Sequence, residues 1–188
     1  MLHPTYPIPT DRLVLRPYND DDLDALSEML RLPEVVRYLY WEVRDRDDAA
    51  EMLKRRTTSD AIRAEGDWLV LAVTLKESGA LLGDVVLKWE SQEHRAGEIG
   101  FVFHPAYHGK GYAYEASRVL LRLGFAEMKL HRIVGRCDAR NTASARLLER
   151  LGMRREAHLV ENEWVKGEWT DEQIYAMLDR EWAATNGL

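Results

Sequence analysis

The residues of this chain that most clearly suggest chemistry form a glycine-bearing loop, HGKGYA, from His108 to Ala113. Gly109 and Gly111 lack Cβ atoms, so the N–H groups of the loop and of the following helix's first turn can converge on one point. Such a nest, added to the positive end of a helix dipole, can bind a phosphate. Tyr114 replaces the third glycine of the GxGxxG dinucleotide motif, and no GxxxxGKS or GxxxxGKT motif is present. The alternative is that the two glycines only form a tight turn.

A second chemical candidate is Ser144, in the segment NTASARLLERLGM that begins at Asn141. Asn141 is a good helix N-cap. Ser144 shares one helical face with Leu147, Leu148 and Leu151, so its hydroxyl points the same way as the leucines. A buried hydroxyl needs a hydrogen-bond partner, and within the helix that partner would be a carbonyl one turn earlier.

Charged residues are unevenly distributed along the second half of the chain. Basic residues accumulate after the loop: Lys110, Arg118, Arg122, Arg132, Arg136, Arg140, Arg146 and Arg150. Acids dominate the segment 156–172: Glu156, Glu161, Glu163, Glu168, Asp171 and Glu172. We interpret most of the arginines as a solvated face and expect Lys110, which lies in the loop, to contact a ligand. The acids would either attract a cationic amine or form a charged edge that discourages aggregation. Trp164 and Trp169 beside them would line a pocket or belong to the core.

Length and composition limit the function further. A chain of 188 residues is predicted to form one domain spanning 1–188. The net charge of −6 argues against a general nucleic-acid binder. The single cysteine, Cys137, suits a reducing compartment and is expected in the core rather than as a nucleophile. The prolines of MLHPTYPIPTDRL leave no apolar signal segment, and no apolar run is long enough for a membrane span. We therefore expect a cytoplasmic protein without a metal site, a membrane partner or a nucleic-acid partner.

Hydrophobic patterning predicts a mixed α/β (α+β) fold with the order βααβββαβαββ. Its sheet is expected to be mostly antiparallel, with six to seven strands and helices on both faces. Strands are predicted at 12–16, 68–75, 81–89, 98–103, 132–137, 155–165 and 172–178, after an extended N-terminal arm over 1–11. Helices are predicted from Asn19 or Asp20 to Pro33, from Asp47 or Asp48 to about Ala64, and over 112–128 and 142–151. In the second helix the stretch KRRTTSD is expected to be solvated. The apolar and aromatic segment VVRYLYW (35–41) would be core or pocket lining.

Four stretches in this order resemble the GCN5-related N-acetyltransferase (GNAT) superfamily, and within it the RimJ/RimL-like branch. They are TDRLVLRPYNDDDLDAL, EIGFVFHPAYHGKGYAYEA, NTASARLLERLGM and NEWVKGEWTDEQIYAML, and together they span nearly the whole chain. One departure is His108, because the first loop position is usually Gln or Arg in this family. Weaker contact with phosphate is the expected consequence.

The resemblance implies acetyl-coenzyme A as cofactor and a site built around it. Phe101, Val102 and Phe103 would pair with the pantetheine arm, where their strand splays from its neighbour. The pyrophosphate would lie on the amides of the loop, from His108 and Gly109 through Lys110 and Gly111 to Tyr112 and Ala113. Asn141 would bond a pantetheine amide, and Ser144 would protonate the leaving thiolate.

The same resemblance implies transfer of acetyl to a primary amine by direct attack, most simply a protein N-terminal α-amine. Glu163 takes the position of the proposed base, and Glu98, which opens the central strand, is its rival. Glu161 would exchange with Glu163 if the register shifted, and His104 before Pro105 is more typical of a structural histidine. Alternatives are a small-molecule acetyltransferase acting on an antibiotic, polyamine or amino acid, and a catalytically weak CoA-binding domain. Dimers are common in the branch.

Overall fold

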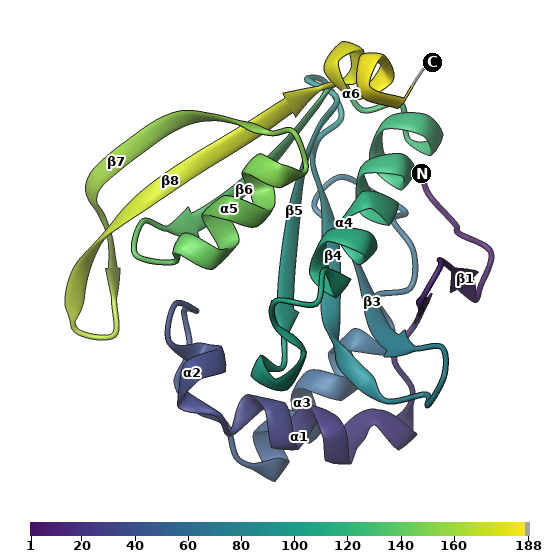
Figure 1. Cartoon of the computed structure of the whole chain (residues 1–188), viewed down its shortest axis with the longest axis vertical. Coiled ribbons are helices and arrows are strands. Elements are labelled where there is room, and N and C mark those ends of the chain that lie inside the picture. Colours follow the sequence, from purple (N-terminus) through teal and green to yellow (C-terminus); the bar gives the residue numbers. More distant parts are fainter. Residues whose placement is uncertain (187–188) are drawn as a thin grey trace.

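The computed structural model describes residues 1–186 and contains one sheet flanked by helices (Figure 1). Within those residues the sheet has eight strands in the order β1-β2-β3-β4-β5-β6-β8-β7. The strands are β1 (Ile8–Pro9), β2 (Leu13–Arg16), β3 (Trp68–Leu75), β4 (Leu81–Ser91), β5 (Ala96–Phe103), β6 (Arg132–Asp138), β7 (Arg154–Val165) and β8 (Glu168–Leu178). The α-helices are α1 (Leu23–Leu30), α2 (Pro33–Val36), α3 (Arg46–Arg56), α4 (Tyr112–Arg122), α5 (Thr142–Arg150) and α6 (Asp179–Asn186). Single turns occur at Asp20–Asp22, Pro105–Tyr107 and Leu123–Glu127.

The predicted fold class and strand connections are confirmed. Strands β3, β4 and β5 form an antiparallel meander, and β5 pairs in parallel with β6 after the crossover through α4. The predicted strand count was one too low. Ile8–Pro9, expected in an extended arm, pairs antiparallel with β2, because Ile8 buries its side chain against the same core.

Two hydrophobic cores lie on opposite faces of the sheet. Helices α4 and α5 cover one face, where Ile99, Phe103 and Leu148 are buried. Helices α1 and α3 cover the other face, where they pack against Ala72 of β3 and Val102 of β5. Because neighbouring residues of a strand point to opposite faces, β5 contributes to both cores. A polar side chain on β5 therefore belongs to one face or the other according to its position in the alternation.

Helix α3 differs from prediction at both ends. Asp45 rather than Asp47 or Asp48 caps α3, accepting from the Asp48 N–H at 2.9 Å. The helix ends at Arg56, not at Ala64. Just after Arg56, the hydroxyls of Thr57 and Thr58 donate to backbone carbonyls that the N–H groups of a longer helix would otherwise bond.

The solvated interpretation of KRRTTSD was wrong for Arg56. Its side chain is only 11% exposed and donates to Asp84, on β4, at 2.6 Å and to the Tyr18 hydroxyl at 3.0 Å. A buried guanidinium needs such a charged partner, and this pair ties α3 to the sheet.

A π-turn over Leu123–Glu127 follows α4, with the Met128 N–H bonded to the Leu123 carbonyl at 2.9 Å. The extra residue per turn rotates Phe125 into the core, while Ala126 is only half-buried.

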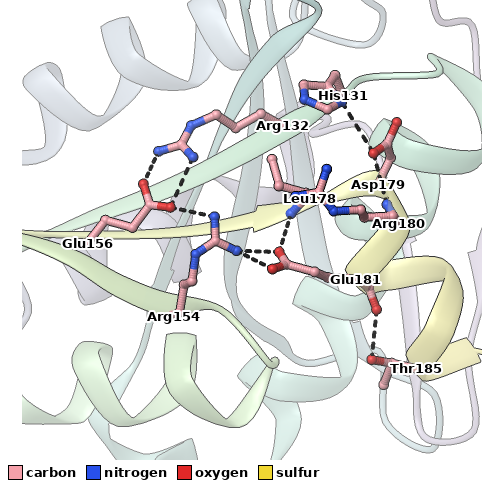
Figure 2. Close-up of polar contacts among 9 residues, drawn as sticks. All are labelled: His131, Arg132, Arg154, Glu156, Leu178, Asp179, Arg180, Glu181 and Thr185. Carbon is pink, nitrogen blue, oxygen red and sulfur yellow. Dashed lines mark hydrogen bonds and ion pairs between the residues drawn. The ribbon is translucent and has the colours of Figure 1, made fainter.

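One end of the sheet is held by a charged network that joins α6 to the strands (Figure 2). Arg154 on β7 pairs with Glu181 on α6, and Arg132 on β6 pairs with Glu156. Glu181 also accepts the Leu178 N–H at 2.8 Å. These ion pairs hold β6, β7 and β8 together at this end of the sheet. The separation of β5 from β6 occurs at the opposite end.

Candidate functional site

Strands β5 and β6 separate after Glu98. They pair only from Ala96–Arg132 to Glu98–Val134, while β5 continues to Phe103 paired with β4 alone. Figure 1 shows the two strands diverging beyond their shared end. The His104 N–H bonds the Leu82 carbonyl on the β4 side, so by strand alternation the backbone groups of Phe101 and Phe103 face the opening. The predicted splay is present, and it leaves main-chain groups available to a ligand.

The glycine loop adopts the conformation that an anion site needs. Gly109 has φ +74° and Gly111 has φ +81°, which is the left-handed region that glycine tolerates best. Gly111 is the N-cap of α4, and no side chain caps this helix. The amides of Tyr112 and Ala113 are therefore among the unpaired donors of an 11-residue helix whose dipole favours an anion.

The side chains of His108 and Lys110 are exposed but bond backbone carbonyls of the chain itself. His108 Nε2 lies 2.9 Å from the Phe103 carbonyl oxygen, so the histidine ties the loop to the end of β5. Lys110 Nζ donates to the Ala106 carbonyl at 3.0 Å and lies over the Tyr107 ring. The ligand contact expected of Lys110 would require this ammonium to leave its present partner. The loop offers a ligand its backbone rather than these side chains.

Arg12 supports the loop from the N-terminal arm, and sequence reasoning missed it. Its guanidinium donates to the Lys110 carbonyl at 2.9 Å and lies 4.6 Å from the centre of the Tyr112 ring. Glu115 on α4 accepts from Arg12 Nε at 2.8 Å and from the Thr10 hydroxyl at 2.6 Å. No local pattern indicates a contact between residues so far apart in sequence.

Helix α5 packs beside the opening on the α4 face. Asn141 caps it as predicted, accepting the Ser144 N–H at 3.1 Å. Leu148 packs on Gly135 of β6 so closely that a Cβ there would lie 2.5 Å from a leucine methyl. Ser144 is half-buried, and among the described residues its hydroxyl shows no hydrogen bond to the carbonyl one turn earlier. The hydroxyl is thus free of its expected structural partner.

The opposite face of the sheet carries a group of carboxylates. Arg136 on β6 lies 3.2 Å from Glu98 on β5 and 3.4 Å from Glu172 on β8. Burial raises the pKa of Glu98, and Arg136 opposes the rise. Burial likewise raises the pKa of Glu172, which also accepts a bond from Asn162 at 3.1 Å. Glu98 stands where β5 and β6 separate, so this group borders the opening.

Glu163 lies on the same face, because it pairs with Thr170 and Thr170 alternates with Glu172. Both of its carboxylate oxygens accept from the Tyr40 hydroxyl, at 2.9 and 3.1 Å. Tyr40 comes from the segment predicted to be core or pocket lining, and 66% of it is exposed. The structure therefore brings that segment to the closing hairpin.

Glu161 does not share the face of Glu163 by simple alternation. Between Leu159–Glu172 and Glu163–Thr170, strand β7 carries two more residues than β8. Glu161 lies in this bulge with φ +48°, and its N–H donates to Asp171 at 2.9 Å. A bulge re-aims side chains, and sequence periodicity could not reveal it.

Three arginines of the basic stretch pair with acids of the segment 156–172. Arg140 pairs with Glu168, Arg136 with Glu172, and Arg132 with Glu156. Asp171 pairs with His158. The predicted solvated basic face and acidic rim therefore neutralise one another in part across β6, β7 and β8. Glu163 differs in having a neutral phenol as its partner.

The remaining candidates have structural positions. His104 Nδ1 accepts the Ala106 N–H at 3.1 Å and caps the turn that follows β5. Trp164 and Trp169 form an edge-to-face pair and are more than half exposed, so the core interpretation was wrong for them. Burial raises the pKa of Cys137 to about 11, which disfavours the nucleophilic thiolate.

A cleft of about 1090 Å³ adjoins the glycine loop on the outer side of α4. It extends from Gly109–Gly111 past Arg118 and Arg150 to Trp182. Glu98, Ser144 and Glu163 lie outside it. The candidate catalytic groups thus surround the β5–β6 opening rather than this cleft.

A sheet that opens beside an uncapped, glycine-led helix can receive an extended ligand that carries a phosphate, and comparison with known proteins identifies the family. Residues 12–154 match the model of the Acetyltransferase (GNAT) domain, so the chain belongs to the GNAT family. It is therefore an acetyl-CoA-dependent N-acetyltransferase.

Three similar proteins illustrate the relationship. The uncharacterized N-acetyltransferase YnaD of Bacillus subtilis is 35% identical over 93% of this chain and 98% of its own length. A GNAT-family acetyltransferase structure from Bacillus anthracis has a TM-score of 0.82 at 34% identity, covering 96% of this chain and 99% of that one. The structure of spermidine N-acetyltransferase from Vibrio cholerae with CoA and spermine has a TM-score of 0.76. At 23% identity, over 92% of this chain and 99% of that one, it shows the fold. No helix within residues 1–186 has the length and apolar character needed to cross a membrane.

Proposed function

We propose that this enzyme acetylates the α-amine of a peptide or protein N-terminus, as RimJ/RimL-like enzymes do. The observation that carries the proposal is the position of Glu163. Its carboxylate is held by a neutral phenol, on the sheet face opposite α5, in the group that borders the β5–β6 opening. The amine would approach from the Glu163 face, and acetyl-CoA would be held by the α4 side.

The donor side of the proposal uses main-chain groups. Phe101 and Phe103 would hold the pantetheine arm with their main-chain groups, whereas the predicted part of Val102 is corrected, because its backbone faces β4. The amides from His108 to Ala113 would hold the pyrophosphate. Asn141 would bond a pantetheine amide. When bound, acetyl-CoA supplies the acetyl group as a thioester. The fit is supported by the uncapped α4 and by the free edge of β5.

The chain's own residues then have distinct tasks. Glu163 accepts a proton from the ammonium, directly or through water, so that a neutral amine can attack. The Phe103 N–H donates to the acyl oxygen as negative charge develops there. As the C–S bond breaks, the Ser144 hydroxyl would give a proton to the departing sulfur and would recover one, through water, from the attacking nitrogen, so that the amide product leaves without a covalent enzyme intermediate. Glu98 is the alternative base, but its ion pair with Arg136 engages it more strongly than a phenol engages Glu163.

An N-terminal acceptor suits a base of this kind. An α-amino group with a pKa of about 8 is already partly neutral at pH 7, whereas a lysine side chain with a pKa of about 10.4 is not. A surface carboxylate that acts through water is then sufficient.

A polyamine is the second candidate, because Glu98, Glu163 and Glu172 offer several carboxylates on one face. A small aminoglycoside or amino acid would belong to the same class of alternative.

We also propose that residues 1–188 form a single cytoplasmic domain that assembles as a homodimer. This proposal rests on sequence and resemblance, and light scattering tests the dimer.

Thiol release measured with a panel of acceptors tests the proposed function. The panel contains peptides with free and with blocked N-termini, spermidine, and an aminoglycoside. We expect turnover of free N-termini and none of blocked peptides that still contain lysine. Faster turnover of spermidine would overturn the peptide assignment. Binding of CoA without turnover of any amine would favour the CoA-binding-domain alternative.

A further inference from the structure

Two contacts join the segment after α2 to the tip of the β7–β8 hairpin. One is the bond from the Tyr40 hydroxyl to Glu163. The other is from Lys166 Nζ to the Val36 carbonyl at 2.6 Å, with Glu42 a further 4.0 Å neighbour of the same ammonium. The Lys166 side chain is only 18% exposed, although it stands in a hairpin turn. The segment is thus anchored at one point and presents Tyr40 at a second point nearby.

We propose that Tyr40 is a positioning residue of the acceptor site, which orients the Glu163 carboxylate for proton removal. This inference rests on the proposed role of Glu163. In this role Tyr40 does not contact the reacting atoms but acts through Glu163.

The geometry supports a specific role rather than a general surface contact. The phenol oxygen lies within hydrogen-bond distance of both carboxylate oxygens, so a single donor centres the group and limits its rotation. Tyrosine is also a donor that stays neutral here, because partial burial of its hydroxyl and the bond to Glu163 both raise the pKa of Tyr40. A lysine or arginine at this place would have formed a salt bridge and would have competed with an ammonium substrate.

The other charges near Glu163 do not provide the same support. Glu172 on β8 and Glu98 on β5 are themselves acids, so each of them disfavours any further negative charge in its neighbourhood. Arg136 on β6 is engaged by those two acids, and Lys166 in the turn by the Val36 carbonyl. Among the described residues, Tyr40 is the side chain seen to donate to the Glu163 carboxylate.

The bond predicts a shift of the pH profile with a defined sign. A donor to a carboxylate stabilises its ionised form and lowers its pKa. Removing only the hydroxyl, in Tyr40→Phe, takes this stabilisation away. The acidic limb of the kcat/KM profile should then move to higher pH by roughly 0.5–1 unit. Low on that limb the shift corresponds to a loss of about three- to tenfold, and the loss should disappear at higher pH, where the base is fully ionised in both enzymes.

The test compares acceptor kcat/KM from pH 4 to 9 in the enzyme, its Tyr40→Phe and Glu163→Gln variants, and the double variant. Lys166→Met is the control, because it loosens the same segment without removing the donor. We expect the limb to move in Tyr40→Phe but not in Lys166→Met, and Tyr40→Phe to have no further effect on Glu163→Gln.

Each failure has its own signature. An unshifted limb in Tyr40→Phe, with activity still lost in Glu163→Gln, would overturn the role of Tyr40 alone. Full activity in Glu163→Gln would overturn the assignment of the base instead. A Tyr40→Phe effect that persists unchanged in the double variant would mean that Tyr40 acts by another route.

Discussion

The donor side and the acceptor side of the β5–β6 opening are built from different parts of the polypeptide. On the donor side, the loop 108–113 and the free edge of β5 present backbone groups, and both come from one continuous stretch of chain. On the acceptor side, Tyr40, Glu98, Glu163 and Glu172 come from four separate elements and present side chains. Donor binding should therefore depend on backbone conformation, and the reaction with the amine on individual side-chain groups.

The sharpest test of this division is Glu163→Gln, which removes the proposed base and keeps the side-chain shape. We expect kcat to fall about 100-fold, the low end of the range for general-base catalysis, with the KM for acetyl-CoA unchanged. Glu161→Gln is the matched control, because Glu161 lies in the bulge of the same strand. Steady-state kinetics that show equal losses in both variants would point to the charge of the hairpin rather than to one base.

Ser144→Ala tests the side chain assigned to proton transfer on the donor side. Without its hydroxyl the departing thiolate loses its proton source, and kcat should fall about 30-fold. The loss should be smaller than for Glu163→Gln, because a thiol with a pKa of about 8.5 leaves without much help. Thr142→Ala, in the first turn of the same helix, should retain normal kcat. If Ser144→Ala does the same, Ser144 has no part in the chemistry.

Gly111→Ala should affect binding rather than chemistry. A side chain at φ +81° costs roughly 1–2 kcal/mol, so the loop should relax away from its present shape. We expect the KM for acetyl-CoA to rise about tenfold with kcat nearly unchanged. Gly79→Ala is the control, because Gly79 has φ +73° in a distant turn with free space around it. Both variants should lose a similar few degrees in Tm, and only Gly111→Ala should change KM.

The smallest effect concerns the stability of the acceptor side. Because burial raises the pKa of Glu98, this group stabilises the fold only below its unfolded pKa of about 4.3, and the contribution is lost as pH rises through the folded pKa. Glu98→Gln avoids the buried charge. Its Tm should exceed that of the parent by about 1–3 °C at pH 8, and the difference should disappear toward pH 4. A lower Tm at pH 8 would mean that the ion pair with Arg136 outweighs burial.

The difference between the donor side and the acceptor side also explains which features the sequence could predict. The glycine loop, the Asn141 cap and the strand connections follow from local spacing, and the structure contains all three. The Arg12–Glu115 clamp and the Arg56–Asp84 pair join residues far apart in the chain, so no periodicity indicates them.

The acceptor side was harder to predict because its geometry depends on irregular structure. The bulge at Glu161 separates two glutamates that strict alternation would place on one face. The arginines of 132–140 and the acids of 156–172 were assigned to separate surfaces, and only the pairing of β6, β8 and β7 brings them together. Family resemblance nevertheless pointed to Glu163 and Glu98, which do lie on a common face.

Hydrogen–deuterium exchange with and without saturating CoA tests the division of the site most directly. We expect slower exchange in peptides covering 99–103 and 108–114, where the free edge of β5 and the uncapped start of α4 would gain partners. Peptides covering 160–172, which carry Glu163 and Glu172, should be unchanged. Protection of the hairpin without protection of the loop would contradict the account, because the cofactor would then bind on the side assigned to the amine.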